Sequence, residues 1–165
     1  MPTRLLDWTA NPLTALFFAV QQPDDDDDGE VFVMGADSLH RDPRGRSIRD
    51  YVHREFVDIL SMRDPIVTSA IAQCFRAGVE PKFEPRILAV RPDNYPGRIG
   101  QQSSCLTLHM HESRDVSNVT LARFTVPKAA KLMLLNQLGR LNINLFTIYN
   151  DLDNLSKSIR NAWGI

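Results

Sequence analysis

The sequence has 165 residues, of which 43% are hydrophobic and 24% are charged, a composition typical of one globular domain. The net charge of −1 argues against strong non-specific binding to nucleic-acid phosphates. Cys74 and Cys105 form neither a disulfide framework nor a metal motif, which indicates reduced thiols. The N-terminus lacks a signal-peptide pattern, and no apolar run approaches the roughly 20 residues that span a bilayer. We therefore expect a cytoplasmic protein.

The first segment, Pro2–Thr9, is predicted to be a buried strand that carries Arg4, Asp7 and Trp8. A buried helix follows it, and polar groups at such a join commonly face a cleft. This join is therefore the leading site candidate. The alternative is structural, with Arg4 and Asp7 as a buried ion pair and Trp8 as part of the core.

The predicted helix starts at Asn11-Pro12. Asn11 can cap the first turn, and Pro12 suits the first helical position because no N–H is needed there. From Leu13 to Val20 only Thr14 is polar. We therefore expect this helix to be covered on nearly all sides.

Residues 21–29 contain five consecutive aspartates and are predicted to be a solvated acidic loop. Contiguous carboxylates lack the ligand spacing of a calcium loop. Glu30–Met34 is predicted to be a strand with apolar residues on both faces, hence central in its sheet. The Arg-rich connection Asp37–Asp50 is predicted to be a surface loop rather than a phosphate-binding segment.

Between Tyr51 and Phe75 apolar residues recur at helical spacing, and Pro65 separates two predicted helices as an early residue of the second. Gly78 is expected to end the second helix. The helical positions are Val52, Phe56, Ile59, Leu60, Ile66, Ala70, Ile71 and Phe75. Residues 51–78 are thus predicted to be a helical covering segment without chemistry of its own.

Pro85–Pro92 is predicted to be a strand whose bounding prolines suit an edge or a strand end. The stretch Arg98–His109 is the second site candidate. His109 and His111 project to the same side of a strand, but no third ligand lies nearby in the sequence. We therefore expect satisfied or surface histidines and no metal site.

The C-terminal third is predicted to contain a strand at Asn118–Val126 and a helix from Lys128 to Leu138 that Gly139 terminates. A short extended piece, Ile143–Tyr149, precedes the last helix. Asp151 and Asp153 are expected to act as caps rather than catalysts. The last helix is expected to bury Leu152, Leu155, Ile159 and Trp163.

Three patches resemble the FRG domain family, which is named for a Phe/Tyr-Arg-Gly motif near its N-terminus. The first is Thr3–Thr9 followed by Asn11-Pro12 and Ala15–Ala19. The second matches at Arg98, Ile99, Gln102 and Thr107, with Ser104 in place of the usual Gly and Leu106 in place of Phe. The third begins the final helix at Asp151–Ile159. The naming motif would lie before Met1, so the resemblance implies a domain that lacks its N-terminal portion or receives it from elsewhere, for example from a protein partner.

The layout of the family is similar to that of mono-ADP-ribosyltransferases, which implies NAD as the cofactor. On that analogy Gln102 is the residue near the reacting carbon, and Asp7 orients Arg4 or a ribose hydroxyl. The ligand-binding residues implied are Arg4, Trp8, Thr9 and Arg98. Glutamine does not stabilise positive charge as glutamate does, which counts against catalysis by Gln102.

The resemblance implies an NAD-binding, ADP-ribosyltransferase-like toxin or phage-defence effector. The alternative is a non-catalytic nucleotide-sensing or regulatory interaction module of such a system. We predict an α+β fold with a mixed, mostly antiparallel sheet flanked by helices, arranged as in the split sheet of ADP-ribosyltransferases. One domain over residues 1–165 is expected, without membrane segments and with no strong nucleic-acid signal.

Overall fold

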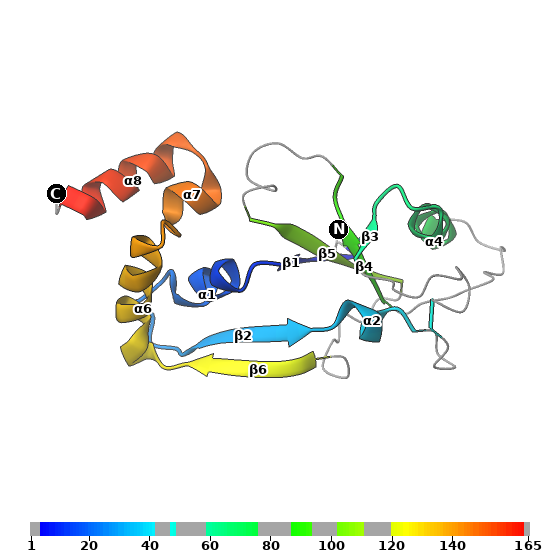
Figure 1. Ribbon diagram of the computed structural model, residues 1–165, viewed down its shortest axis with the longest axis horizontal. Coiled ribbons are helices and arrows are strands. Elements are labelled where there is room, and N and C mark those ends of the chain that lie inside the picture. The colour runs from blue at the N-terminus through cyan, green and yellow to red at the C-terminus, as the bar shows by residue number, and fades with distance from the viewer. Residues whose placement is uncertain are drawn as a thin grey trace. The chain divides into compact units, whose positions relative to one another are not determined.

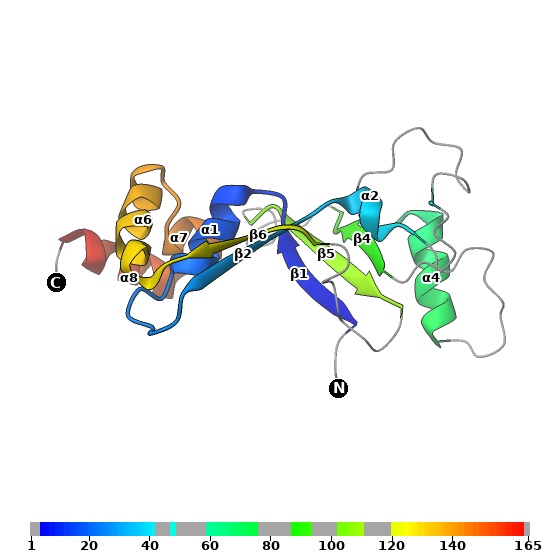
Figure 2. The same ribbon diagram turned by 90° about the horizontal axis from the view of Figure 1, so that it is seen from below.

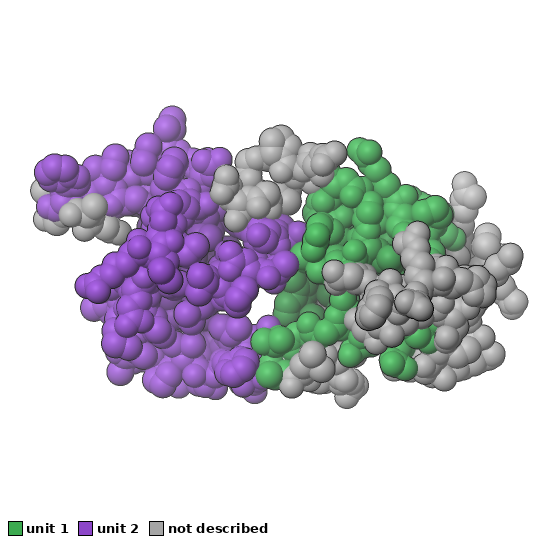
Figure 3. Space-filling view, in the orientation of Figure 1, with its two compact units in different colours: residues 1–8, 33–93, 105–122 green, residues 9–32, 94–104, 123–165 purple. Residues whose placement is uncertain are grey.

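The computed structural model describes residues 4–41, 47–48, 59–75, 87–93, 102–110 and 120–163 (Figure 1). The chain divides into two compact units, which Figure 3 shows in different colours. Unit 1 comprises residues 1–8, 33–93 and 105–122, and unit 2 comprises residues 9–32, 94–104 and 123–165. The single domain expected over the whole chain stays a prediction.

The described residues form both strands and helices, which confirms the α+β class. The strands are β1 (Leu5–Thr9), β2 (Gly29–Met34), β3 (Leu60–Ser61), β4 (Ile87–Arg91), β5 (Ser104–His109) and β6 (Thr120–Val126). The helices are α1 (Pro12–Val20), α2 (Ala36–Leu39), α4 (Pro65–Phe75), α6 (Lys128–Arg140), α7 (Leu145–Tyr149) and α8 (Leu152–Trp163). Within the described part of the chain, no helix combines the length and apolar content needed to cross a bilayer.

Four strands form a mixed sheet in the order β1-β5-β4-β3, and β2 pairs with β6. β4 pairs antiparallel with β5 and parallel with β3, where Leu60 lies opposite Val90. The amide of His109 donates to the carbonyl of Arg4 at 2.9 Å, and Figure 2 shows β1 and β5 running in opposite directions. The predicted mixed, mostly antiparallel arrangement is confirmed.

Different helices cover the two faces of β4 in unit 1, because successive side chains of a strand point to opposite faces. Leu88 belongs to a core cluster with Val67 of α4. Ala89, its neighbour in the strand, belongs to a second cluster with Leu39 of α2. The sheet of unit 1 is therefore buried on both sides around β4.

Two predictions for unit 1 are wrong. Leu60 lies in β3 rather than in a helix, because pairing with β4 outweighs its helical spacing. β4 lies between β5 and β3 and is not an edge strand, but Pro92 directly follows it, so the strand-end alternative is confirmed and no ladder hydrogen bond is lost. Residues 37–39 of the expected surface loop belong to α2. The expectations for residues 51–58, Gly78, Arg98 and His111 lie outside the described residues.

α1 begins as predicted, with the amide of Leu13 donating to the Asn11 side chain at 2.9 Å. The expectation that α1 is covered on nearly all sides is wrong. Its buried side chains form a single stripe at a spacing of three residues, while Leu13 and Phe18 are exposed. The stripe consists of Thr14, Phe17 and Val20. Phe17 and Val20 share a core cluster with Val126, Leu138 and Ile148.

β2 is not a central strand. It pairs with β6 in a two-stranded sheet, and its Phe32 and Val33 are exposed. Arg123 of β6 covers part of Phe32, with its guanidinium carbon 5.6 Å from the ring centroid. Arg123 also donates to Glu30 at 3.0 Å. Cross-strand pairs of this kind, rather than burial on both faces, stabilise this sheet.

The end of α6 also differs from the prediction, because Gly139 lies inside the helix. The amide of Asn142 donates to the Gly139 carbonyl at 3.0 Å, and that of Ile143 donates to the Leu138 carbonyl at 2.9 Å. Asn142 has a φ of 61°. These bonds form a Schellman motif in which asparagine takes the left-handed position that glycine usually occupies.

The predicted extended piece at Ile143–Tyr149 is wrong, because residues 145–149 form α7. Asn144 accepts from the Thr147 amide at 3.1 Å, and the Thr147 hydroxyl accepts from the Asn144 amide at 2.9 Å. This reciprocal capping box starts the helix. Asn150, with a φ of 50°, ends it.

α8 starts as predicted, with the Asn154 amide donating to Asp151 at 2.8 Å. Its expected burial is wrong for three of the four apolar positions. Leu152, Ile159 and Trp163 are exposed, and Leu155 is half-buried. The apolar stripe of an amphipathic helix thus faces solvent in this chain.

Candidate functional site

The predicted site residues of unit 1 lie on β1 or, in the case of Arg4, directly before it. The guanidinium of Arg4 donates to the main-chain oxygen of Met110 at 2.6 Å. The indole N–H of Trp8 donates to the Thr107 hydroxyl of β5 at 3.1 Å. Both side chains therefore tie β1 to the segment that carries β5.

The Thr107 hydroxyl, which accepts from Trp8, has a second partner in the interior of unit 1. The Thr107 hydroxyl lies 2.9 Å from Nε2 of His109, and both residues are almost completely buried. Because successive strand side chains alternate, Thr107 and His109 share one face of β5. The expectation that His109 is a satisfied histidine is confirmed. Buried polar groups that bond one another in this way hold a strand register.

Asp7 differs from its neighbours because its side chain is exposed. Arg4 bonds to Met110 instead of Asp7. The alternative of a buried Arg4–Asp7 ion pair is therefore wrong. Among the predicted site residues of unit 1, Asp7 is the one whose polar group faces solvent.

In unit 2, Thr9 and Gln102 come together. The Thr9 hydroxyl donates to the main-chain oxygen of Gln102 at 2.6 Å and accepts from the Asn11 amide at 3.0 Å. The side-chain amide of Gln102 donates to the main-chain oxygen of Ile148 at 3.1 Å. Gln102 thereby links the turn before β5 to α7, and its amide oxygen makes no hydrogen bond within the described residues.

The backbone next to Gln102 includes the position where Ser104 replaces the glycine that is usual in the FRG family. Ser103 has a φ of 48°, in the left-handed region that favours glycine. Ser104, which stands in place of that glycine, is the first residue of β5 instead. The position that favours glycine in this backbone is therefore Ser103 rather than Ser104.

The acceptors of these bonds are not recognisable from the sequence. Met110 and Ile148 accept through main-chain oxygens, which every residue type carries. Only the fold brings them to Arg4 and Gln102. No side-chain pattern in the sequence points to these two pairings.

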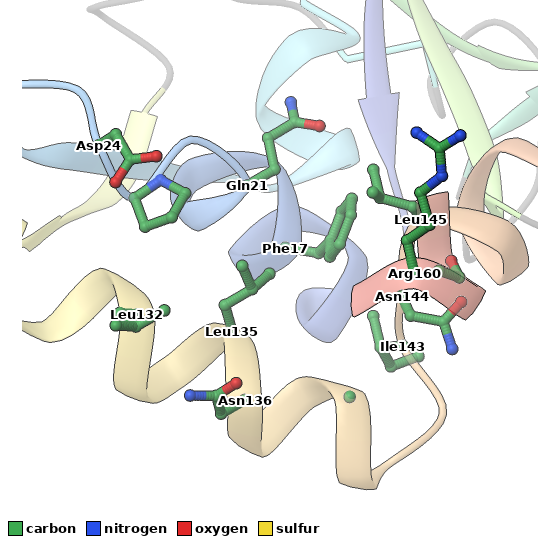
Figure 4. Close-up of a pocket in the computed structure, with 13 residues that line it drawn as sticks. Phe17, Gln21, Asp24, Leu132, Leu135, Asn136, Ile143, Asn144, Leu145 and Arg160 are labelled. Atoms are coloured by element: carbon green, nitrogen blue, oxygen red, sulfur yellow. The ribbon is translucent and has the colours of Figure 1, made fainter. Parts of the chain in front are cut away.

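Unit 2 also contains a cavity of about 870 Å³ between α1, α6, α7 and α8 (Figure 4). The sequence gives no indication of it, because the residues come from four separate stretches, 17–24, 132–139, 143–145 and 158–160. It is lined by Phe17, Gln21, Pro23, Asp24, Leu132, Leu135, Asn136, Gly139, Ile143, Asn144, Leu145, Ser158 and Arg160. Its volume is in the range of small-molecule sites.

The described residues contain no group of three or more His, Cys, Asp or Glu side chains that could hold a metal ion. Comparison with known proteins gives one match, in which residues 1–28 fit the family model of the FRG domain. This match confirms the resemblance over β1, α1 and the acidic loop. No curated protein and no solved structure matches the chain.

Proposed function

We propose that this chain, whose residues 1–28 match the FRG domain, is a non-catalytic nucleotide-sensing module of a bacterial toxin or phage-defence system. The link to such systems rests on the FRG resemblance. The choice of sensing over catalysis rests on how the motif side chains are used in the fold.

One observation carries this choice. Apart from Asp7, the structure describes four motif side chains that were predicted to bind ligand or substrate. Each of these four donates a hydrogen bond within its own unit. The four are Arg4, Trp8, Thr9 and Gln102. A group that positions a reacting ribose needs its polar atoms for the substrate. These side chains instead support strand pairing and the attachment of α7.

ADP-ribosyl transfer from NAD is the second candidate, because two hydrogen-bond acceptors of the motif stay open. They are the exposed Asp7 carboxylate and the amide oxygen of Gln102. In such a reaction the bond between nicotinamide and the ribose breaks, an acceptor nucleophile takes the ribose carbon, and nicotinamide leaves. Both acceptors are of a kind that binds ribose hydroxyls.

A labelling experiment separates the two candidates. The chain is incubated with radiolabelled NAD and cell lysate, beside a Gln102→Ala/Asp7→Ala double variant. The sensing proposal predicts equal background label for both proteins, together with a thermal shift of the wild-type chain on addition of NAD or AMP. Label that depends on the two residues would favour transfer instead.

A further inference from the structure

We propose that the cavity in unit 2 binds a nucleoside monophosphate, with the phosphate at Arg160 and the base against the apolar side chains of α6 and of residues 143–145. The choice of a nucleotide rests on the proposed nucleotide-sensing function. The polarity of the cavity is a property of the structure alone and limits which nucleotide fits.

The middle of the cavity is apolar. Phe17 of α1 faces Leu135 of α6, and Ile143 and Leu145 lie on the far side of Phe17 from Asp24 (Figure 4). Phe17 itself is only 1% exposed, so the accessible apolar surface that suits a flat ring comes from Leu132, Leu135, Ile143 and Leu145. The volume of about 870 Å³ is sufficient for a mononucleotide.

Arg160 supplies a positive charge at one end. It lies in the last turn of α8, and it forms no hydrogen bond or ion pair with the described residues. A guanidinium without a carboxylate partner is suited to bind a phosphate in bidentate geometry. Lys157, one turn earlier on the same helix, does not line the cavity.

The opposite end has the opposite polarity. Figure 4 shows Asp24 and Arg160 on opposite sides of Phe17, with Asn136 of α6 below it. Asp24 makes no ion pair with any described residue, whereas Asp26 in the same loop pairs with Lys128. A carboxylate at this end accepts hydrogen bonds from an amine or hydroxyl and disfavours a second anion.

These two ends limit the class of ligand. A single anion at Arg160 and hydrogen-bond donors at Asp24 fit a mononucleotide. A nucleotide with anionic groups at both ends would place one of them near Asp24. The carboxylate of a fatty acid would pair with Arg160. A fatty acid carries no hydrogen-bond donor for Asp24 and no polar group for Asn136. The arrangement therefore favours a nucleoside monophosphate.

Calorimetric titration of the 165-residue chain with AMP tests this inference, with adenosine and inorganic phosphate as separate probes. The key variant is Arg160→Gln, and Lys157→Gln is the matched control because it removes one positive charge from the same helix. We expect Arg160→Gln to weaken AMP binding about tenfold or more, since a charge-assisted hydrogen bond is lost. Lys157→Gln should bind AMP within about twofold of wild type, because Lys157 does not line the cavity.

Adenosine is expected to bind all three proteins equally and more weakly than AMP, because it lacks the phosphate. Circular dichroism confirms that the variants are folded. If Arg160→Gln binds AMP as tightly as wild type, the placement of the phosphate is overturned while nucleotide sensing stands. If neither AMP nor NAD binds the wild-type chain at millimolar concentration, the proposed function itself fails.

Discussion

The side-chain amide of Gln102 donates to the main-chain oxygen of Ile148 at 3.1 Å, and this bond connects the turn before β5 to α7. Ile148 is 2% exposed and lies in the main core cluster of unit 2. The residue expected to stand beside a reacting ribose thus has a structural role in this chain.

Replacing Gln102 by Ala is expected to lower the free energy of unfolding by about 1–3 kcal/mol, because a part-buried carbonyl loses its donor. Urea denaturation followed by circular dichroism measures the change. Gln137→Ala is the control, since Gln137 is exposed on α6 and its change should stay within about 0.5 kcal/mol. Equal stability of Gln102→Ala and wild type would show that the bond does not support the fold.

Trp8→Phe removes the indole donor to Thr107 and keeps a ring in its place. We expect a loss of about 1–3 kcal/mol in the free energy of unfolding, because the buried Thr107–His109 pair loses a partner. Trp163→Phe is the matched control, because Trp163 is 78% exposed. A loss as large in the control as in Trp8→Phe would speak against the register role of Trp8.

Gly29→Ala tests the approach of β2 to α1. A Cβ at Gly29 would lie 2.3 Å from the Ala19 carbonyl oxygen, a contact that backbone atoms must move to relieve. We expect destabilisation of about 1–3 kcal/mol by urea denaturation. Gly139→Ala is the control, because nothing lies within 4 Å of a Cβ added at Gly139. Alanine at this helical position should raise the free energy of unfolding by up to about 1 kcal/mol. A neutral Gly29→Ala would refute the close approach.

Asp28→Asn tests the role of the acidic loop at α6. The Lys128 amide donates to the Asp28 carboxylate at 2.8 Å, and Pro127 at the helix start offers no side-chain cap. Loss of the negative charge should lower the free energy of unfolding by about 1 kcal/mol or less, as measured by thermal unfolding at low salt. Asp27→Asn serves as the control. The effect should shrink at high salt, and a salt-independent loss would argue against an electrostatic cap.

The local features of the fold were predictable where neighbouring residues determine them. Asn11-Pro12 starts α1, and Asp151 caps α8, because a cap needs only a few consecutive residues. The capping box of Asn144 and Thr147 was equally local but has threonine in place of the usual Glu or Gln. Apolar content alone therefore predicted an extended segment where α7 forms.

Long-range features were not predictable from periodicity. Ile159 and Trp163 have the spacing of a core face, yet they are exposed because burial depends on which elements pack against α8. In the candidate site, Arg4, Trp8 and Gln102 were predicted to bind ligand or act in catalysis, and these roles stay predictions. Their partners are main-chain or distant groups that only the fold brings near.

The most direct measurement of the central claim is transfer of label from NAD by the wild-type chain and by Gln102→Ala, in parallel with AMP binding by both proteins. A nucleotide-sensing module predicts background label in both cases and AMP affinity that Gln102→Ala leaves within about twofold, because the affected hydrogen bond lies within the fold. Label transferred by the wild-type chain and lost in a folded Gln102→Ala variant would contradict this account.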